Sequence, residues 1–479
     1  MTPLGCIAAD ACLFVLEEHG VFFSELRQEL QVFNTPATFI WCCLEEGLGP
    51  SEAVAAYAET FGIDPAEAQR QVADMLHRWQ GLGHVSGVEM EGASEIDLTT
   101  ALGRLLANPA LRRQHAESAV DVARALPLRA SDMDAFLALD PAALEAEADL
   151  LRRRHLGMRD GSAAGDEAVP AALDRNAGLV ELAARARARR GAPLGIAHCY
   201  SLLGTTVRVQ FASAEVAAIV HPVLAHLEVG EPRSVDATLD ILEVEPGYVL
   251  LEGIVPSGYC ARLSHLAPLV KSALRRIGLN RHDYFLQIHA GVVSSGERCL
   301  ILPAAAGSGK TTLTAALLRA GFAYFSDEYA LLEQPDMRVR PVPLALTVKP
   351  GAAAVLASRY PELAQLAAHR REDEQTVRYL PPPPPLPPAG RSLPIGWIVF
   401  PRYSPDAETA LRPIGRADAL QRLMGECLVL PEALERRGVE ALVRWMREVG
   451  CFELTMSDLD QAVRLVVQLC RTPGPDARG

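Results

Sequence analysis

Three short apolar segments open the chain, and helical spacing follows them. The segments 12–16, 21–23 and 30–33 predict short strands, and Leu30-Gln31-Val32 alternates apolar with polar residues. Helix starts are expected at Thr35-Pro36, at Ser51 and at Asp64-Pro65, because small polar residues and proline are favoured there. The third helix carries apolar residues at helical spacing up to Trp79. Residues 1–92 are therefore predicted to form one small α+β unit.

The pattern changes twice more along the chain. Residues 97–156 keep helical spacing, with starts at Ser131 and Asp140-Pro141, and are interpreted as an all-helical spacer module. Residues 157–190 are predicted to be a linker, because 157–167 are rich in Gly, Asp and Ala. Strand patterns at 206–211, 239–244 and 249–254, a helix near 267–277 and a strand–loop–helix–strand run then predict an α/β domain over 191–475.

Composition narrows the function classes. The net charge of −13 disfavours nucleic acid as a partner, since such proteins usually carry a basic face. The ten cysteines include no C-x-x-C pair, which favours free thiols in a reducing compartment. The N-terminus has no positive region before its apolar stretch, and no apolar segment is long enough to cross a bilayer. We expect a cytoplasmic protein with no membrane partner.

Lysine is scarce, and one lysine stands in a glycine-containing loop. The chain has three lysines, Lys271, Lys310 and Lys349, among its 46 basic residues. Gly307-Ser308-Gly309-Lys310-Thr311-Thr312 follows a buried strand and opens a helix, as in a Walker A loop. An ammonium group can reach between phosphate oxygens where a planar guanidinium fits poorly. The loop predicts ATP binding, with the Thr311 hydroxyl as a ligand of Mg²⁺. The alternative is that these residues form only a Gly/Ser turn between a strand and a helix.

Polar residues flank this loop on both sides in sequence. Ser326-Asp327-Glu328 ends the next predicted strand, where acidic side chains can bind metal or act as a base. His289 precedes the strand before the loop. Taken alone, His289 is better explained by a structural role, and Asp327 can be explained as the cap of a turn. Lys349 is a candidate for a second phosphate contact. The alternative is that it is an ordinary surface lysine.

Together these residues resemble the catalytic core of HPr kinase/phosphorylase. The resemblance covers about 195–470, and is closer to HPr-kinase-related proteins of peptide-modification gene clusters, whose Ser-Asp-Glu and Phe-Pro-x-Tyr stretches appear at 326–328 and 400–403. Ala304 and Ala306 stand where the family has glycine and serine. No segment matches the signature linked to dephosphorylation, so the resemblance implies the kinase activity and leaves the phosphorylase activity open.

The resemblance implies a role for each matching residue. Lys310 would hold the β- and γ-phosphates, and Asp327 would accept the proton of the acceptor hydroxyl. His289 would lie beside Asp327 and tune it. Thr311 and Glu328 would serve Mg²⁺. The fold implied is a P-loop kinase domain of HPr-kinase type, and homo-oligomers are compatible with it because hexamers occur in the family.

Residues 5–88 resemble the PqqD family, whose small winged-helix (α+β) domains recognise leader peptides in ribosomal peptide modification, and the resemblance implies this fold for residues 1–92. The resemblance rests on 33–41, Glu45-Glu46-Gly47 and 82–85. In that family a peptide adds as a strand beside the third strand and packs on the third helix. The implied peptide-binding residues here are Leu30, Val32, Phe33, Val72, Met75 and Trp79. A generic DNA-binding winged helix is the alternative, which the excess of acidic residues over three arginines disfavours.

These observations favour an ATP- and Mg²⁺-dependent kinase that phosphorylates a hydroxyl, serine by preference, of a ribosomally made precursor peptide. The N-terminal unit would hold the leader of that peptide. Two alternatives remain open: a serine kinase of a folded carrier protein, and a non-catalytic adaptor that uses nucleotide as a switch.

Overall fold

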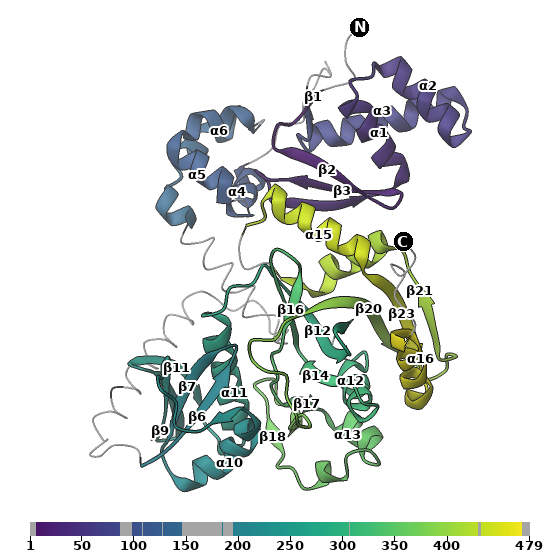
Figure 1. The fold of residues 1–479 in the computed structure, drawn as a ribbon. Helices are drawn as coiled ribbons and strands as arrows, with labels where there is room; N and C mark the ends of the chain where they lie inside the picture. The colour runs from purple at the N-terminus through teal and green to yellow at the C-terminus, as the bar shows by residue number, and fades with distance from the viewer. Residues whose placement is uncertain are drawn as a thin grey trace. The chain divides into compact units, whose positions relative to one another are not determined.

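The structure is a computed structural model of a mixed α/β protein (Figure 1). It describes residues 6–86, 98–107, 109–126, 128–145, 184, 195–305, 307–429 and 433–471. The predicted linker and Ala306 lie outside these residues, apart from residue 184. Contacts divide the chain into two compact units: Met1–Asp160 with Gly415–Gln421 and Glu432–Arg447, and Gly161–Ile414 with Arg422–Pro431 and Glu448–Gly479. The predicted boundaries at 92, 156 and 190 stay predictions.

The first unit begins with a three-stranded antiparallel sheet followed by three helices. The sheet has the order β2-β3-β4, so β4 lies at an edge. The elements are β1 (Cys6–Ile7), β2 (Ala11–Leu16), β3 (His19–Ser24), β4 (Glu29–Phe33), α1 (Thr35–Glu45), α2 (Pro50–Phe61), α3 (Pro65–Gly81) and β5 (Val85–Ser86). The three predicted strands and the starts of α1 and α3 are confirmed. The second helix begins at Pro50 rather than being capped by Ser51, and Glu52 accepts a hydrogen bond from the Gly49 amide (2.9 Å).

Aromatic residues fill the space between this sheet and its helices. Phe33 of β4 stacks on Trp79 of α3 with ring centroids 5.3 Å apart. Phe22, Trp41 and Val72 belong to the same buried cluster. Burial of several large rings is the main source of stability for a unit this small.

Two C-terminal segments belong to the first unit by their contacts. They are most of α14 (Arg416–Arg422) and α15 (Arg436–Glu448). The Gln28 side chain exchanges two hydrogen bonds with the backbone of Leu434, at 2.8 and 2.6 Å, and Arg447 donates to the carbonyl of Val15 in β2. Sequence patterning had predicted both segments within the kinase-like domain. Long-range contacts of this kind leave no mark in local periodicity.

The middle of the chain is helical where it is described. Its helices are α4 (Leu98–Ala107), α5 (Pro109–Glu117), α6 (Ala119–Ala125) and α7 (Met133–Leu137). Asp140 accepts a hydrogen bond from the Ala142 amide (3.0 Å), as expected for a helix start. Ser131 lies instead inside a 3₁₀ turn, and α7 begins two residues later.

The second unit contains a six-stranded sheet and a larger mixed sheet. The first has the order β11-β10-β9-β7-β6-β8. Its elements are β6 (Ile196–Leu202), β7 (Thr205–Phe211), α10 (Ala214–Leu224), β8 (Glu228–Val229), β9 (Ala237–Val244), β10 (Gly247–Glu252), β11 (Val255–Cys260) and α11 (Leu266–Leu279). The strand predicted over 249–254 ends at Glu252, because Gly253 turns the chain with φ +59°.

The predicted loop follows a strand of the larger sheet. Its strands are β12 (Leu286–Ser295), β13 (Arg298–Pro303), β14 (Ala323–Ser326), β15 (Tyr329–Glu333), β16 (Arg338–Arg340), β20 (Leu393–Tyr403), β21 (Ala410–Pro413), β22 (Leu428–Val429) and β23 (Gly450–Met456). Beside it are α12 (Lys310–Arg319), α13 (Pro350–Leu356), α16 (Leu459–Arg471) and a small sheet of β17 (Leu346–Val348), β18 (His369–Arg370) and β19 (Thr376–Leu380). Within the second unit, Tyr329, Leu331 and Tyr379 share one buried cluster with the six-stranded sheet.

Candidate functional site

Strand β12 brings the three sequence-predicted motifs together. Its register pairs Ala290 with Pro303 at the end of β13, Val292 with Ser326 at the end of β14, and His289 with Tyr329 at the start of β15. β13 and β14 each run antiparallel to β12, and therefore parallel to one another. The loop after β13 and the acidic pair after β14 consequently emerge at the same end of the sheet.

Glycines permit the tight geometry at this end. Gly307 and Gly309 have φ of +91° and +87°, which residues with a side chain rarely adopt. Gly291 lets β12 approach α12, since a Cβ there would lie 2.4 Å from Thr314 Oγ1. The Tyr403 amide donates to the carbonyl of Ser308 (3.1 Å), so the predicted 400–403 stretch lies against the loop.

Side chains from the loop helix contact the two other motifs directly. Lys310 Nζ lies 2.7 Å from His289 Nε2, and Thr311 Oγ1 donates to Asp327 Oδ2 (2.9 Å). An ammonium group cannot accept a hydrogen bond, so Nε2 is the acceptor and the ring proton resides on Nδ1. The structure thus gives His289 a contact with Lys310, and its predicted place beside Asp327 stays a prediction.

Asp327 is a buried carboxyl group, and only one of its two oxygens accepts a hydrogen bond from a described residue. Only 3% of the residue is exposed, and Oδ1 has no hydrogen-bond partner among the described residues. Burial raises the pKa of Asp327 to about 7, with nearby Glu328 acting in the same direction and the Lys310 ammonium acting against it. A carboxyl group with this pKa exchanges its proton near neutral pH.

Glu328 has a different set of partners. Lys271 Nζ donates to its Oε1 (2.8 Å), the Thr347 hydroxyl donates to the same oxygen (3.0 Å), and Arg275 lies 3.7 Å from Oε2. Burial would raise the pKa of Glu328, but Lys271 and Arg275 outweigh it and hold the pKa far below its ordinary range. Glu328 therefore stays ionised across the pH range in which Asp327 gains or loses its proton.

Lys271 and Arg275 are absent from the residues predicted from the sequence. They lie four residues apart on α11, hence on one helix face, and Lys271 is 5% exposed. The scarcity of lysine that drew attention to Lys310 applied equally to Lys271, so a signal was present. Lys349 is half-buried at the start of α13, and its backbone carbonyl accepts from the Ala353 amide (2.9 Å). Its predicted phosphate contact stays a prediction.

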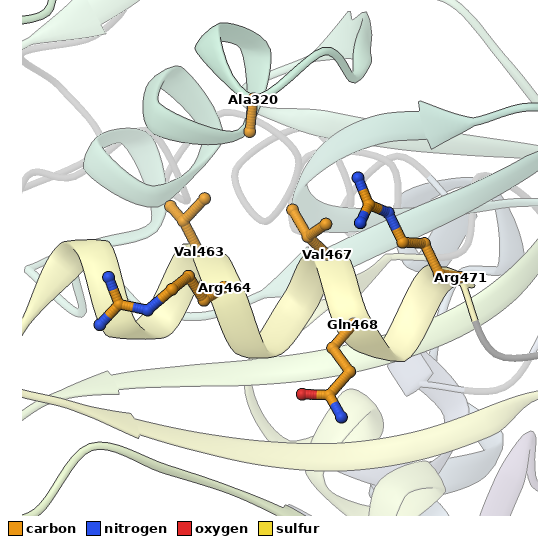
Figure 2. A pocket seen from close by; sticks show the side chains of 6 residues that line it. All are labelled: Ala320, Val463, Arg464, Val467, Gln468 and Arg471. Atoms are coloured by element: carbon orange, nitrogen blue, oxygen red, sulfur yellow. The ribbon is translucent and has the colours of Figure 1, made fainter.

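The remaining loop residues lie at the start of α12. Ser308 Oγ is buried with no hydrogen-bond partner among the described residues, and Thr312 is half-buried in the first turn. An open pocket lies elsewhere, between the end of α12 and α16, lined by Ala320, Val463, Arg464, Val467, Gln468 and Arg471. Figure 2 shows Val463 and Val467 on the side of α16 toward Ala320. None of the predicted site residues lines it.

The predicted peptide-binding residues divide between two faces of the N-terminal sheet. Phe33, Val72 and Trp79 are core residues, each less than 7% exposed, so they support the surface rather than form it. Met75 is only partly buried against that core. Leu30 and Val32 alternate with Phe33 and so project to the opposite face. The six residues do not form one side-chain surface.

Among the described residues, β4 is nevertheless an edge strand of its sheet. The two-residue turn after Leu16 makes Leu16–His19 a hydrogen-bonded pair, so odd-numbered residues of β3 bond to β2 and even-numbered residues bond to β4. Leu30 and Val32 face odd-numbered residues, and their own backbone groups therefore point to the free edge. The outward carbonyl of Val15, which accepts from Arg447, obeys the same alternation.

The three-stranded sheet and its three helices make the N-terminal part of the chain a small α+β domain. In a comparison with known families, residues 18–85 match the model of coenzyme PQQ synthesis protein D (PqqD). The N-terminal part of the chain is thus a PqqD-like domain.

Two other comparisons were made, with solved structures and with curated proteins. A solved structure titled "TbiB1 in Complex with the TbiA(beta) Leader Peptide" matches with a TM-score of 0.17 and 20% identity, over 18% of this chain and 99% of that chain. Comparison with curated proteins gives no match. Of the helices in the described residues, none has the length and apolar character needed to span a membrane.

Proposed function

We propose that the chain is an ATP- and Mg²⁺-dependent kinase that phosphorylates a hydroxyl, serine by preference, of a ribosomally made precursor peptide. The PqqD-like domain binds the leader of that peptide. The observation that carries the proposal is the cluster of Lys310, Thr311 and Asp327 at the start of α12. A lysine, a hydroxyl and a base are the groups that phosphoryl transfer requires at a helix N-terminus.

ATP and Mg²⁺ fit the residues at the loop. Gly307 and Gly309 allow backbone N–H groups to converge on phosphate oxygens. Ser308 Oγ and Asp327 Oδ1 are buried polar atoms that lack partners among the described residues. A phosphate oxygen of the nucleotide would supply the partner of Ser308 Oγ, and the acceptor hydroxyl would supply that of Asp327 Oδ1. Bound Mg²⁺ would neutralise charge on the phosphoryl group. Thr311 is the protein ligand best placed to hold it.

Asp327 supplies the base. A base works best when its pKa lies near the working pH, and the pKa of Asp327 is raised to about 7. Ionised Asp327 accepts the proton of the acceptor hydroxyl as the oxygen bonds to the γ-phosphorus and ADP departs. Glu328 is a poor candidate for this role, because Lys271 and Arg275 keep its carboxylate paired. For Glu328 to bind Mg²⁺ as the family resemblance implies, this pairing would have to open.

The PqqD-like domain provides the reason to propose a peptide substrate. Its β4 edge offers outward backbone groups at Leu30 and Val32, to which an extended leader can add as a strand. Tethering the leader raises the effective concentration of the acceptor at the kinase site. Few acceptor contacts are then needed at Asp327.

The proposal is tested by incubating the full chain with MgATP and the peptide encoded by a short reading frame beside its gene. Mass spectrometry is expected to show one phosphate added to the peptide by the native chain and none by the Lys310→Ala variant. Phosphorylation of a folded carrier protein alone would favour the carrier-kinase alternative. Nucleotide binding with no transfer to either would favour the adaptor.

A further inference from the structure

A second cluster of chemically active side chains lies in the six-stranded sheet. His198 of β6, His221 of α10 and Glu228 of β8 each present one ligand atom, and these atoms all lie within 4.8 Å of one another. His198 Nδ1 is 2.5 Å from Glu228 Oε1, and His221 Nε2 is 3.9 Å from Glu228 Oε2. The two imidazole rings stack with centroids 4.2 Å apart. We propose that His198, His221 and Glu228 bind one divalent transition-metal ion of the Zn²⁺ class.

The separations suit a metal of this size. Zn²⁺ binds nitrogen and oxygen ligands at about 2.0–2.2 Å, so two ligands of a tetrahedral site lie roughly 3.3 Å apart. The His198–Glu228 pair is closer than this by less than 1 Å, and the His221–Glu228 pair is wider by less than 1 Å. Side-chain rotation alone can provide such shifts, since all three side chains are partly exposed.

A buried tyrosine orients the second histidine. Tyr200 Oη lies 2.9 Å from His221 Nδ1, and Tyr200 is fully buried. When Nδ1–H donates to this oxygen, the lone pair of Nε2 faces Glu228. Outer-shell hydrogen bonds of this kind fix the tautomer of metal-binding histidines.

Two histidines and one glutamate leave a fourth position open. The same donor set occurs in zinc sites that keep a water or ligand in that position. The proposed site draws on β6, α10 and β8, none of which contributes to the Lys310–Asp327 cluster, so it is independent of the proposed kinase chemistry.

The test is a calorimetric titration of chelator-treated full-length protein with Zn²⁺. The native chain is expected to bind one ion that His198→Gln and His221→Gln each weaken by at least about 10-fold, the effect seen even for outer-shell changes. Tyr200→Phe is expected to weaken binding about 10-fold while leaving the stoichiometry unchanged.

The matched control is His265→Gln, which removes the histidine of a separate His265–Glu374 pair (3.2 Å) and should bind Zn²⁺ like the native chain. Circular dichroism checks that each variant is folded. If the His198 variant unfolds, the His221 variant provides the test. The proposal is overturned if the native chain binds no Zn²⁺, or if both cluster variants bind it with native affinity, which would assign the ion to the ten cysteines or elsewhere.

Discussion

The raised pKa of Asp327 predicts a pH-dependent stability cost that one substitution removes. The pKa of this buried carboxyl rises from 3.8 to about 7, so between these values the folded protein binds more protons than the unfolded chain. Stability of the second unit therefore falls as pH rises through this window. Asp327→Asn removes the titrating group while keeping a similar shape and the capacity to accept from Thr311.

The magnitude follows from the size of the shift. At about 1.4 kcal/mol per pKa unit, Asp327 costs about 1.5 kcal/mol near pH 5 and about 4 kcal/mol near pH 8. Relative to the native chain, Asp327→Asn should thus gain about 2.5 kcal/mol of unfolding free energy between these two conditions. Other titrating groups, including Glu328, are common to both proteins and cancel in the comparison.

The assay is urea-induced unfolding followed by hydrogen exchange of peptides covering β12 and α12, which reports on the second unit. Asp336→Asn, at an exposed position in the β15–β16 turn, controls for the loss of a carboxylate. A difference between native and Asp327→Asn proteins that stays constant from pH 5 to pH 8 would refute the argument from burial.

Three further substitutions test separate parts of the account. Lys310→Ala should abolish phosphoryl transfer and leave the circular dichroism spectrum unchanged; retained transfer would remove the loop assignment. Lys271→Met should lower the unfolding free energy by about 3 kcal/mol, because it removes the ammonium closest to the buried Glu328 carboxylate and leaves it with the Thr347 hydroxyl and the more distant Arg275. A loss under about 1 kcal/mol in urea unfolding would contradict this. Val32→Pro removes an outward N–H donor of β4. It should raise KM for the full-length precursor and leave activity on a core peptide at high concentration nearly unchanged. Val32→Ala keeps the donor and should have little effect on either substrate. Equal slowing of both substrates by Val32→Pro would contradict leader delivery.

Local sequence rules predicted elements whose ends depend on local chemistry. Helix α12 begins at Lys310 and α3 at Pro65, as expected, because a glycine with positive φ and a proline fix these starts through the backbone alone. Ser326 likewise shapes the bend that carries the acidic pair, accepting hydrogen bonds from the Glu328 and Tyr329 amides.

Features that depend on distant contacts were not predictable in this way. Lys271 lies 57 residues from Glu328 in the chain, and nothing in local patterning links them. Trp79 has the spacing of a binding residue on α3, yet the rings of Phe33 and Trp41 cover it. Which apolar residues remain exposed is decided by tertiary packing, whereas periodicity only selects the face.

The central claim is that Asp327 serves as the base for phosphoryl transfer at a nucleotide site built on Lys310. Nucleotide affinity by calorimetry and transfer from radiolabelled ATP, measured on the same Asp327→Asn preparation, test it most directly. The account predicts nearly unchanged MgATP affinity together with loss of transfer, since the base acts on the acceptor hydroxyl. Full transfer activity in this variant would contradict the claim, and joint loss of affinity and transfer would make Asp327 a metal ligand instead.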